Sequence, residues 1–373
     1  MPFCPGLLRF LAGKKAKPFI VLVLCLVVTG LWLSVDFIFA GGRRDTAEDP
    51  SGEEAPAISA EPEPVALEEA APPQERGLFR MAALPGSLRP GEPVTIGLLF
   101  PADTGGEASP PIYAVLVNTQ GRRLSRAAFF ALPDGPPDLA GVEVQAAVLA
   151  IPSTFRPGKA FIRTDPPLEG LEDIPLTVVD RDFVFETIDL NEENTDLRTR
   201  EDVQKMAEAE QLWALLRRPG DRVYAGEAFE APVGSPRRTS FFGDRRVYRY
   251  IDGSADTAIH AGIDYGVPRG TPVHACAPGK VVLARSRIVT GNSVIIEHFP
   301  GVYSLYYHLD TIAVAEGGMV EKGGLLGESG ATGLATGPHL HWEIRVAGEN
   351  ADPDAFIERS VLDKTAILGK LTE

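Results

Sequence analysis

The sequence predicts a mainly β protein in which two β-rich regions are joined by a helix. Short apolar runs separated by proline and glycine occupy the region from Gly77 to Leu190, a spacing typical of an all-β domain of sandwich type. A helical period follows at residues 199–218, and from about Gly234 the chain returns to short runs rich in Val, Ile and Tyr. At 373 residues, the chain is long enough for two folded domains and their linkers.

In the first β-rich region, residues 77–190, the expected strands are Val94–Phe100, Ile112–Asn118, Val142–Ile151, Lys159–Arg163 and Leu176–Ile188. Catalytic residue types do not cluster in this region. We therefore interpret it as a β-rich interaction or spacing module.

The joining helix is predicted within residues 191–225. Val203, Met206, Leu212 and Leu216 give residues 199–218 an apolar face at helical spacing, and Pro219 ends the pattern. The segment is too short for several coiled-coil heptads, so it is interpreted as a connecting helix.

The N-terminus resembles a membrane anchor followed by a tether. Residues 1–17 are basic, and residues 18–40 are long and apolar enough to cross a bilayer, which predicts a cytoplasmic N-terminus and exported domains. The alternative is a signal peptide cleaved near Ala40. Residues 41–76 consist mainly of Glu, Ala and Pro, a composition typical of a disordered linker.

Charge and cysteine content exclude several classes of function. The formal net charge of −15 argues against a nucleic-acid partner, because phosphates would be repelled. The three cysteines suggest neither a disulfide framework nor a thiolate metal site. Any metal must therefore be held by nitrogen and oxygen ligands.

All six histidines lie in the C-terminal region, at His260, His274, His298, His308, His339 and His341. In an extended chain, residues four apart share a face, so His260 and Asp264 can both reach one ion. Taken alone, this H-x-x-x-D pattern is weak, since a surface histidine and a turn aspartate would also produce it.

Two further segments alternate as strands do. In residues 338–346, His339 and His341 share a face with Glu343 and Arg345, opposite an apolar face that includes Trp342. In residues 303–309 the same period places Tyr306 beside His308 and opposite Leu305, Tyr307 and Leu309. Singly, each histidine is equally consistent with a structural role.

The ordered motifs resemble the M23 (lysostaphin-type, LytM-like) family of zinc endopeptidases that cleave bacterial peptidoglycan. They are SFFGDRRVYRY, HAGIDYGVPRGTPVHACAPGKVV, GNSVIIEH, YSLYYHL and GESGATGLATGPHLHWEIR. The resemblance implies an antiparallel β-sheet metallopeptidase domain at residues 226–355, followed by a C-terminal tail at 356–373. It also implies Zn²⁺ ligands at His260, Asp264 and His341 and catalytic histidines at His308 and His339.

The expected function is therefore a membrane-anchored, zinc-dependent endopeptidase that hydrolyses peptide cross-links of peptidoglycan in the periplasm. A water on the metal would be the nucleophile, and either His308 or His339 could be the base. The expected partners are peptidoglycan stem peptides and the inner membrane. The alternatives are a non-catalytic peptidoglycan-binding regulator of other wall hydrolases and an enzyme whose middle domain inhibits it. His274 and His298 are expected to be structural.

Overall fold

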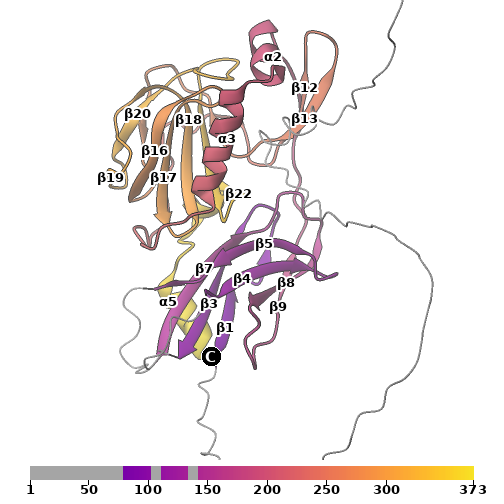
Figure 1. Ribbon diagram of the computed structural model, residues 1–373, viewed down its shortest axis with the longest axis vertical. Helices are drawn as coiled ribbons and strands as arrows, with labels where there is room; N and C mark the ends of the chain where they lie inside the picture. Colours follow the sequence, from indigo (N-terminus) through magenta and orange to yellow (C-terminus); the bar gives the residue numbers. More distant parts are fainter. Residues whose placement is uncertain (1–78, 102–110, 133–141) are drawn as a thin grey trace, which may run out of the picture. The chain divides into compact units, whose positions relative to one another are not determined.

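The computed structural model describes residues 79–101, 111–132 and 142–373, which form part of one compact unit and are mainly β, as the sequence predicts (Figure 1). The expected cytoplasmic segment, membrane anchor and acidic linker, residues 1–76, lie outside the described residues. In the described part of the chain, no helix is both long and apolar enough to cross a bilayer.

The middle region folds into two β-sheets that share an apolar core. One sheet has the strand order β1-β3-β7-β6 and the other β2-β9-β8-β4-β5. Their strands are β1 (Arg80–Leu84), β2 (Ser87–Leu88), β3 (Pro93–Pro101), β4 (Tyr113–Asn118), β5 (Arg123–Ala128), β6 (Phe130–Ala131), β7 (Val142–Ala150), β8 (Gly158–Asp165) and β9 (Ile174–Val178). Ile96 and Leu149 from the first sheet pack with Leu116 and Ile162 from the second. The two sheets therefore stabilise each other by burying one face each.

The sheet formed by β1, β3, β7 and β6 is covered on both sides. On β7, Ala147 and Leu149 face the second sheet, whereas Ala146 and Val148 join a core shared with the C-terminal region. Burial of both faces explains why the second half of β7, Ala146 to Ala150, is entirely apolar. One predicted run, Leu176–Ile188, spans two strands of different sheets, because β10 (Phe185–Asp189) pairs elsewhere.

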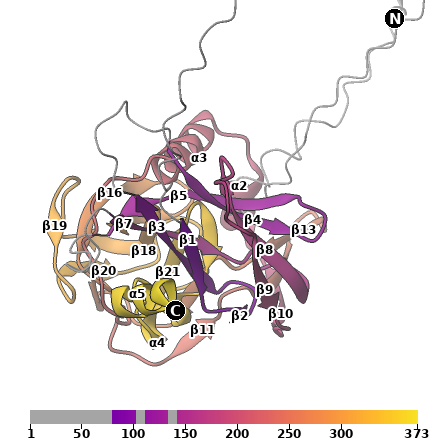
Figure 2. The ribbon, with the colours of Figure 1, turned by 90° about the horizontal axis from the view of Figure 1, so that it is seen from below.

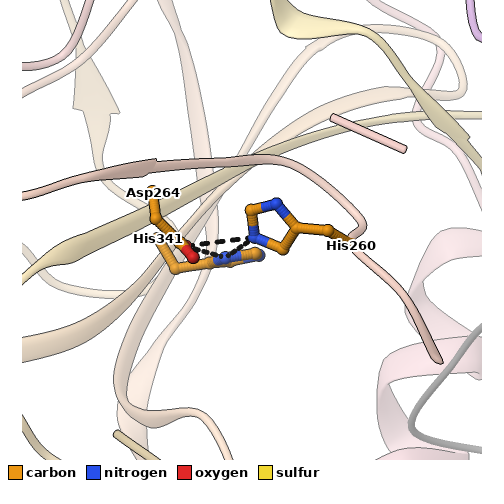
Figure 3. Close-up of side chains that lie close together, drawn as sticks. All are labelled: His260, Asp264 and His341. Carbon is orange, nitrogen blue, oxygen red and sulfur yellow. Dashed lines mark hydrogen bonds and ion pairs between the residues drawn. The ribbon is translucent and has the colours of Figure 1, made fainter. Parts of the chain in front are cut away.

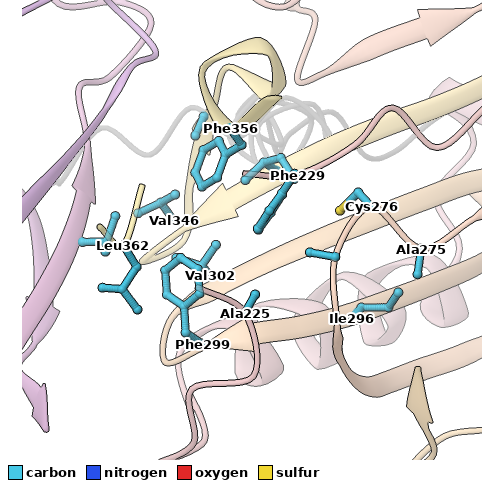
Figure 4. Packing of buried hydrophobic residues seen from close by; sticks show 14 of the residues in the cluster. Ala225, Phe229, Ala275, Cys276, Ile296, Phe299, Val302, Val346, Phe356 and Leu362 are labelled. Carbon is cyan, nitrogen blue, oxygen red and sulfur yellow. The ribbon is translucent and has the colours of Figure 1, made fainter. Parts of the chain in front are cut away.

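The end of the chain returns to the middle module. Residues 356–373, expected as a tail, include the end of α4 (Pro353–Glu358) and the whole of α5 (Lys364–Thr372). Helix α5 contacts β1 and β3 (Figure 2). The preceding Leu362 packs with Phe299, Val302 and Phe356 in the shared core (Figure 4). The middle module and the C-terminal domain are thus joined by buried apolar side chains as well as by the chain itself.

The C-terminal domain is built on a ten-stranded sheet whose main order is β11-β14-β21-β18-β17-β16-β19. Strand β15 pairs with β20, β22 pairs with β21, and β20 also pairs with β18. The strands are β11 (Arg238–Ser240), β14 (Ile263–Tyr265), β15 (Pro272–His274), β16 (Gly279–Arg287), β17 (Gly291–Phe299), β18 (Val302–Ile312), β19 (Met319–Val320), β20 (Leu325–Ser329), β21 (Leu340–Val346) and β22 (Glu349–Ala351). The strand pairings in this sheet are antiparallel, as the resemblance implied.

A smaller sheet is formed by β10 and by two strands that follow β11 in the sequence. Strand β10 pairs in parallel with β12 (Arg245–Arg249), which forms an antiparallel pair with β13 (Ala255–Ile259). The chain between β10 and β12 contains two helices, α2 (Glu192–Thr199) and α3 (Val203–Leu216). The sequence predicted one helix over residues 199–218. The break arises at Asp202, whose side chain caps α3 by accepting hydrogen bonds from two backbone N–H groups.

Helix α3 lies on one face of the large sheet (Figure 1). Leu216 packs with Leu283 and Ile295 of the sheet, and Leu212 and Trp213 pack against the same group. This helix therefore covers part of one face of the large sheet. Every residue of β21 is buried.

Docking of α5 makes a testable contribution to stability. Ile367 is 1% exposed, and a Cβ added to Gly97 of β3 would lie 2.6 Å from its Cγ2 atom. We expect Ile367→Ala to lower the free energy of unfolding by about 2–5 kcal/mol, because it removes buried carbons and leaves a cavity. Urea unfolding of the full chain measures this change. Thr365→Ala, at an exposed position of the same helix, is the control, and equal stability of the two variants would contradict the docking.

Candidate metal centre

Two neighbouring strands bring Asp264 and His341 together. In the antiparallel pairing of β14 with β21, these residues are direct partners. Residues directly opposite each other on paired strands project from the same face. His260 follows the end of β13 and precedes β14. Gly262 lets this connection approach β21 closely, since a Cβ there would lie 2.1 Å from the carbonyl oxygen of Trp342.

The three predicted ligands converge on one point (Figure 3). Nε2 of His260 lies 3.1 Å from Oδ1 of Asp264 and 3.0 Å from Nδ1 of His341. Nδ1 of His341 lies 2.7 Å from the same carboxylate oxygen. Ligand atoms around a tetrahedral zinc ion with bonds of about 2 Å are separated by about 3.3 Å. The observed separations fit such an ion with little rearrangement.

Hydrogen bonds at the far side of each ring fix which nitrogen can bind a metal. Nδ1 of His260 lies 2.8 Å from the carbonyl oxygen of Phe241, and Nε2 of His341 lies 2.9 Å from a carboxylate oxygen of Glu343. These acceptors require an N–H group at that ring nitrogen, so the other nitrogen of each ring faces the centre and is the one that would bind a metal. Two imidazoles and one carboxylate leave the fourth position of a tetrahedral zinc ion open, which is the composition of a catalytic site.

Next to the predicted ligands, buried residues of opposite charge form ion pairs. Glu343 pairs with Arg345 at 2.8 Å, and both side chains are less than a tenth exposed. Burial would raise the pKa of Glu343, but Arg345 and His341 lower it to about 2. Glu343 therefore stays ionised and orients His341. The pattern of alternation placed Glu343 and Arg345 on this face, but it gave no signal that both would be buried or that Trp213 of α3 would lie next to Arg345.

Asp264 is also fixed on its outer side. Arg246 of β12 lies 2.9 Å from Oδ2 of Asp264 and also pairs with Glu186 of β10. Sequence reasoning did not single out Arg246 or Glu186, because neither belongs to a histidine-containing motif. The small sheet therefore anchors a predicted metal ligand from outside the large sheet.

The pKa values of the two ligand histidines move in opposite directions although they share Asp264. Burial lowers the pKa of His260. At His341, burial is outweighed by Asp264 and Glu343, which raise its pKa to about 9. A metal at this centre must displace the proton on Nδ1 of His341, so its affinity depends on pH.

His308 and His339 lie beside the three ligands. Their ring centroids are 4.7 Å apart, and the ring of His308 is 6.2 Å from that of His341. Each ring has Nδ1 close to a backbone carbonyl oxygen, that of Thr332 at 2.7 Å for His308 and that of Gly337 at 2.8 Å for His339. Each Nε2 is therefore available for chemistry in the space next to the centre.

The predicted alternation around His308 is wrong at one point. Tyr306 was expected on the same face as His308, but it packs in the main core opposite Trp342, whereas Tyr307 stacks on His341 with ring planes 5° apart. The cause is the backbone of His308, which has φ of +61° next to an irregularity in the pairing of β17 with β18. This left-handed conformation brings Tyr307 and His308 to the same side of the sheet.

Burial and its histidine neighbours decide the charge of His308. Burial, together with His339 and His341, lowers its pKa to about 3. His308 is therefore neutral at neutral pH, and its Nε2 carries a lone pair.

The remaining histidines lie outside this group. His298 is buried in the core, where Nδ1 donates to the carbonyl oxygen of Pro278 and Nε2 lies 2.7 Å from Oγ of Ser304. Burial lowers its pKa to about 4. His274 is half-buried on β15. Neither residue lines the groove at the metal centre.

The centre opens into a groove of about 470 Å³. The five predicted site residues all line it, together with residues from β10, α2, β12 and β13, namely Glu186, Ile188, Arg198, Arg246, Tyr248 and Ala258. Helix α2 is also tied to the loop before β21, since Nδ2 of Asn194 donates to the carbonyl oxygen of Ala335 at 3.3 Å. The groove is therefore shaped partly by the chain that precedes the large sheet.

The role of Glu343 gives a testable prediction. We expect Glu343→Gln to weaken zinc binding by about 10- to 100-fold, because the neutral amide orients His341 less firmly and leaves Arg345 unpaired. Competition with a chromophoric chelator measures the affinity. Glu316→Gln is the matched control, since Glu316 pairs with Arg285 on the exposed surface. Equal affinities of the two variants would show that the contact between Glu343 and His341 does not support the metal.

Comparison with known proteins agrees with this geometry. Residues 258–353 match the model of peptidase family M23. Over 95 residues the chain is 45% identical to DD-carboxypeptidase/endopeptidase Mpg of Neisseria meningitidis, a match that covers 26% of this chain and 22% of the relative. Over 118 residues it is 41% identical to peptidoglycan DD-endopeptidase ShyA of Vibrio cholerae, covering 31% of this chain and 27% of the relative. The chain thus spans about a quarter of the length of these curated relatives.

A solved structure described as an M23 peptidase from Pseudomonas aeruginosa is also similar, with 27% identity and a TM-score of 0.44 over 72% of this chain and 94% of that one. The ligand set and the matching family together identify the metal as zinc. Residues 258–353 therefore form a zinc-dependent peptidase domain of family M23.

Proposed function

We propose that this protein is a zinc metalloendopeptidase that hydrolyses peptide cross-links of bacterial peptidoglycan. The observation that carries the proposal is the pair formed by His308 and His339 beside a complete three-ligand centre. A structural metal site would use a fourth protein ligand instead of an open groove with two available imidazoles. The named activities of the relatives from N. meningitidis and V. cholerae support peptidoglycan as the substrate.

In this proposal, His260, Asp264 and His341 would hold the zinc ion. Zinc, when bound, would polarise the scissile carbonyl and acidify a water molecule in the groove. The chain's own residues supply the remaining chemistry. One of His308 and His339 accepts a proton at its neutral Nε2, and the other, when protonated on both nitrogens, donates a hydrogen bond from Nε2 to the carbonyl oxygen as negative charge develops there.

The surrounding residues keep these groups in place before substrate arrives. Thr332 and Gly337 accept hydrogen bonds from Nδ1 of the two catalytic histidines, so neither ring can rotate freely. Glu343 and Arg246 hold two of the metal ligands from their outer sides. Such preorganisation reduces the rearrangement required in the transition state.

The N-terminal sequence supports a proposal about location. We infer that residues 18–40 anchor the protein in the inner membrane and that residues 41–76 extend the folded part into the periplasm. The anchor would confine the activity to wall within reach of the membrane. The mass of the mature protein tests this inference, since cleavage near Ala40 would release the domains from the membrane.

Chelation provides a first test of the activity. The purified full chain in detergent should release cleaved peptides from isolated sacculi, and a zinc chelator should abolish that release, because the metal supplies the electrophile. Addition of zinc should restore it. Mass spectrometry of the products also identifies the bond that is cut. Bound zinc without any release would favour a non-catalytic wall-binding protein.

His308 provides a second test. His308→Ala should lower the rate of release by at least about 100-fold, because it removes one of the two catalytic imidazoles. Zinc content should stay near that of the unaltered protein, since His308 is not a ligand in the proposed set. His274→Ala, at a histidine outside the groove, serves as the control. Retention of activity by His308→Ala would exclude His308 from catalysis.

A further inference from the structure

We propose that Arg237 determines specificity by binding a free carboxylate of the peptide substrate. This inference rests on the proposed endopeptidase function and extends it to the charge of the substrate. Arg237 lines the groove together with Asp264 and His339. It precedes residue 258, where the match to the family model begins.

The sheet places Arg237 at a fixed distance from the metal centre. Strand β11, which begins at the next residue, pairs with β14 so that Ser240 lies opposite Asp264. The N–H group of Gly266 donates to the carbonyl oxygen of Arg237 at 3.1 Å and extends this contact. Two residues along a strand, as from Asp264 to Gly266, span about 7 Å. The backbone of Arg237 therefore lies about two to three residues' length, or ~7–10 Å, from the centre along the direction of the strands.

The guanidinium group is held against the backbone at this position. Nη1 of Arg237 donates to the carbonyl oxygen of Gly266 at 3.1 Å. A side chain at position 266 would prevent this contact, because its Cβ would lie 2.9 Å from Nη1 of Arg237 and 2.6 Å from Cγ2 of Thr239. One bond to a carbonyl oxygen leaves most of the five N–H donors of the guanidinium group available.

The other arginines of the groove are already paired. Arg198 binds Asp256 at 3.0 Å, and Arg246 bridges Glu186 and Asp264. Arg237 is exposed, and no ion pair with a carboxylate joins it to any residue in the described ranges. A planar guanidinium group can bind a carboxylate through two parallel hydrogen bonds. Peptides with a free carboxylate close to the scissile bond would supply the missing partner.

The test uses two substrates that differ by one charge. Peptide dimers joined through a D-alanyl–diaminopimelate bond are prepared with the diaminopimelate carboxyl group next to the scissile nitrogen as either a free acid or a carboxamide. The full chain in detergent, loaded with zinc, should cleave the acid with a kcat/KM about 10- to 100-fold higher than the carboxamide, which corresponds to one charged hydrogen-bonded pair.

Arg237→Gln should remove this preference by lowering kcat/KM for the acid while leaving that for the carboxamide nearly unchanged. Arg237→Lys should retain part of the preference, because it keeps the charge without the planar geometry. Arg122→Gln, on the turn between β4 and β5, is the charge-matched control and should behave like the unaltered protein. A purely structural role for Arg237 would instead lower both values equally, and that result would overturn the proposal.

A binding measurement separates failure of this proposal from failure of the proposed function. Cleavage of both substrates at equal rates by the unaltered protein would overturn the role of Arg237 and leave the endopeptidase function intact. Cleavage of neither would count against these dimers as substrates. The dissociation constants of the same two peptides would then decide the role of Arg237. Tighter binding of the acid that Arg237→Gln abolishes would support the proposal, and equal binding would overturn it.

Discussion

The contact between β14 and β21 is the constraint on which the site depends. It places Asp264 directly opposite His341, and their side chains meet at 2.7 Å on the buried face of the sheet. A shift of one residue in this pairing would turn one of the two side chains to the other face and separate the ligands. Close packing on the other face resists such a shift, because Ile263 lies opposite Trp342 there and both are fully buried. The apolar core thus fixes the geometry of the polar centre.

The ionised groups around the centre form a chain of pairs that extends away from the groove. His341 contacts Glu343, Glu343 contacts Arg345, and the guanidinium carbon of Arg345 lies 5.9 Å from the ring centroid of Trp213 on α3. Each of these buried charges therefore has a partner of opposite charge. Such pairing is needed because an unpaired charge is costly to bury. Because α3 lies outside the segment that matches the family, the surroundings of this chain of pairs depend partly on residues that precede the matched segment.

The chain before the domain also contributes to the groove itself. Strand β10 follows directly from the middle module and pairs with β12, which presents Arg246 to Asp264. At the other end of the domain, α5 returns to β1 and β3 of the module. The two regions are consequently connected at both ends of the peptidase domain, and β10 and α2 both line the groove.

The sequence by itself determined the mainly β class, most strands of the middle region and the five residues now found around one groove. These properties depend on local periodicity and on short motifs, which neighbouring residues encode. It predicted a helix over residues 199–218, where α3 lies, but it predicted neither α2 nor the break between the two helices.

Only the tertiary structure decided the register of β14 with β21, the left-handed backbone of His308 and the burial of Glu343 and Arg345. Each depends on residues far apart in the sequence, and alternation along one strand cannot specify what packs against it. Arg198 pairs with Asp256 and Arg246 with Asp264, and Arg237 is thereby left available in the groove. These pairings are also decided by the tertiary structure. A charge is free or paired according to its neighbours in space, and those neighbours come from separate strands and helices.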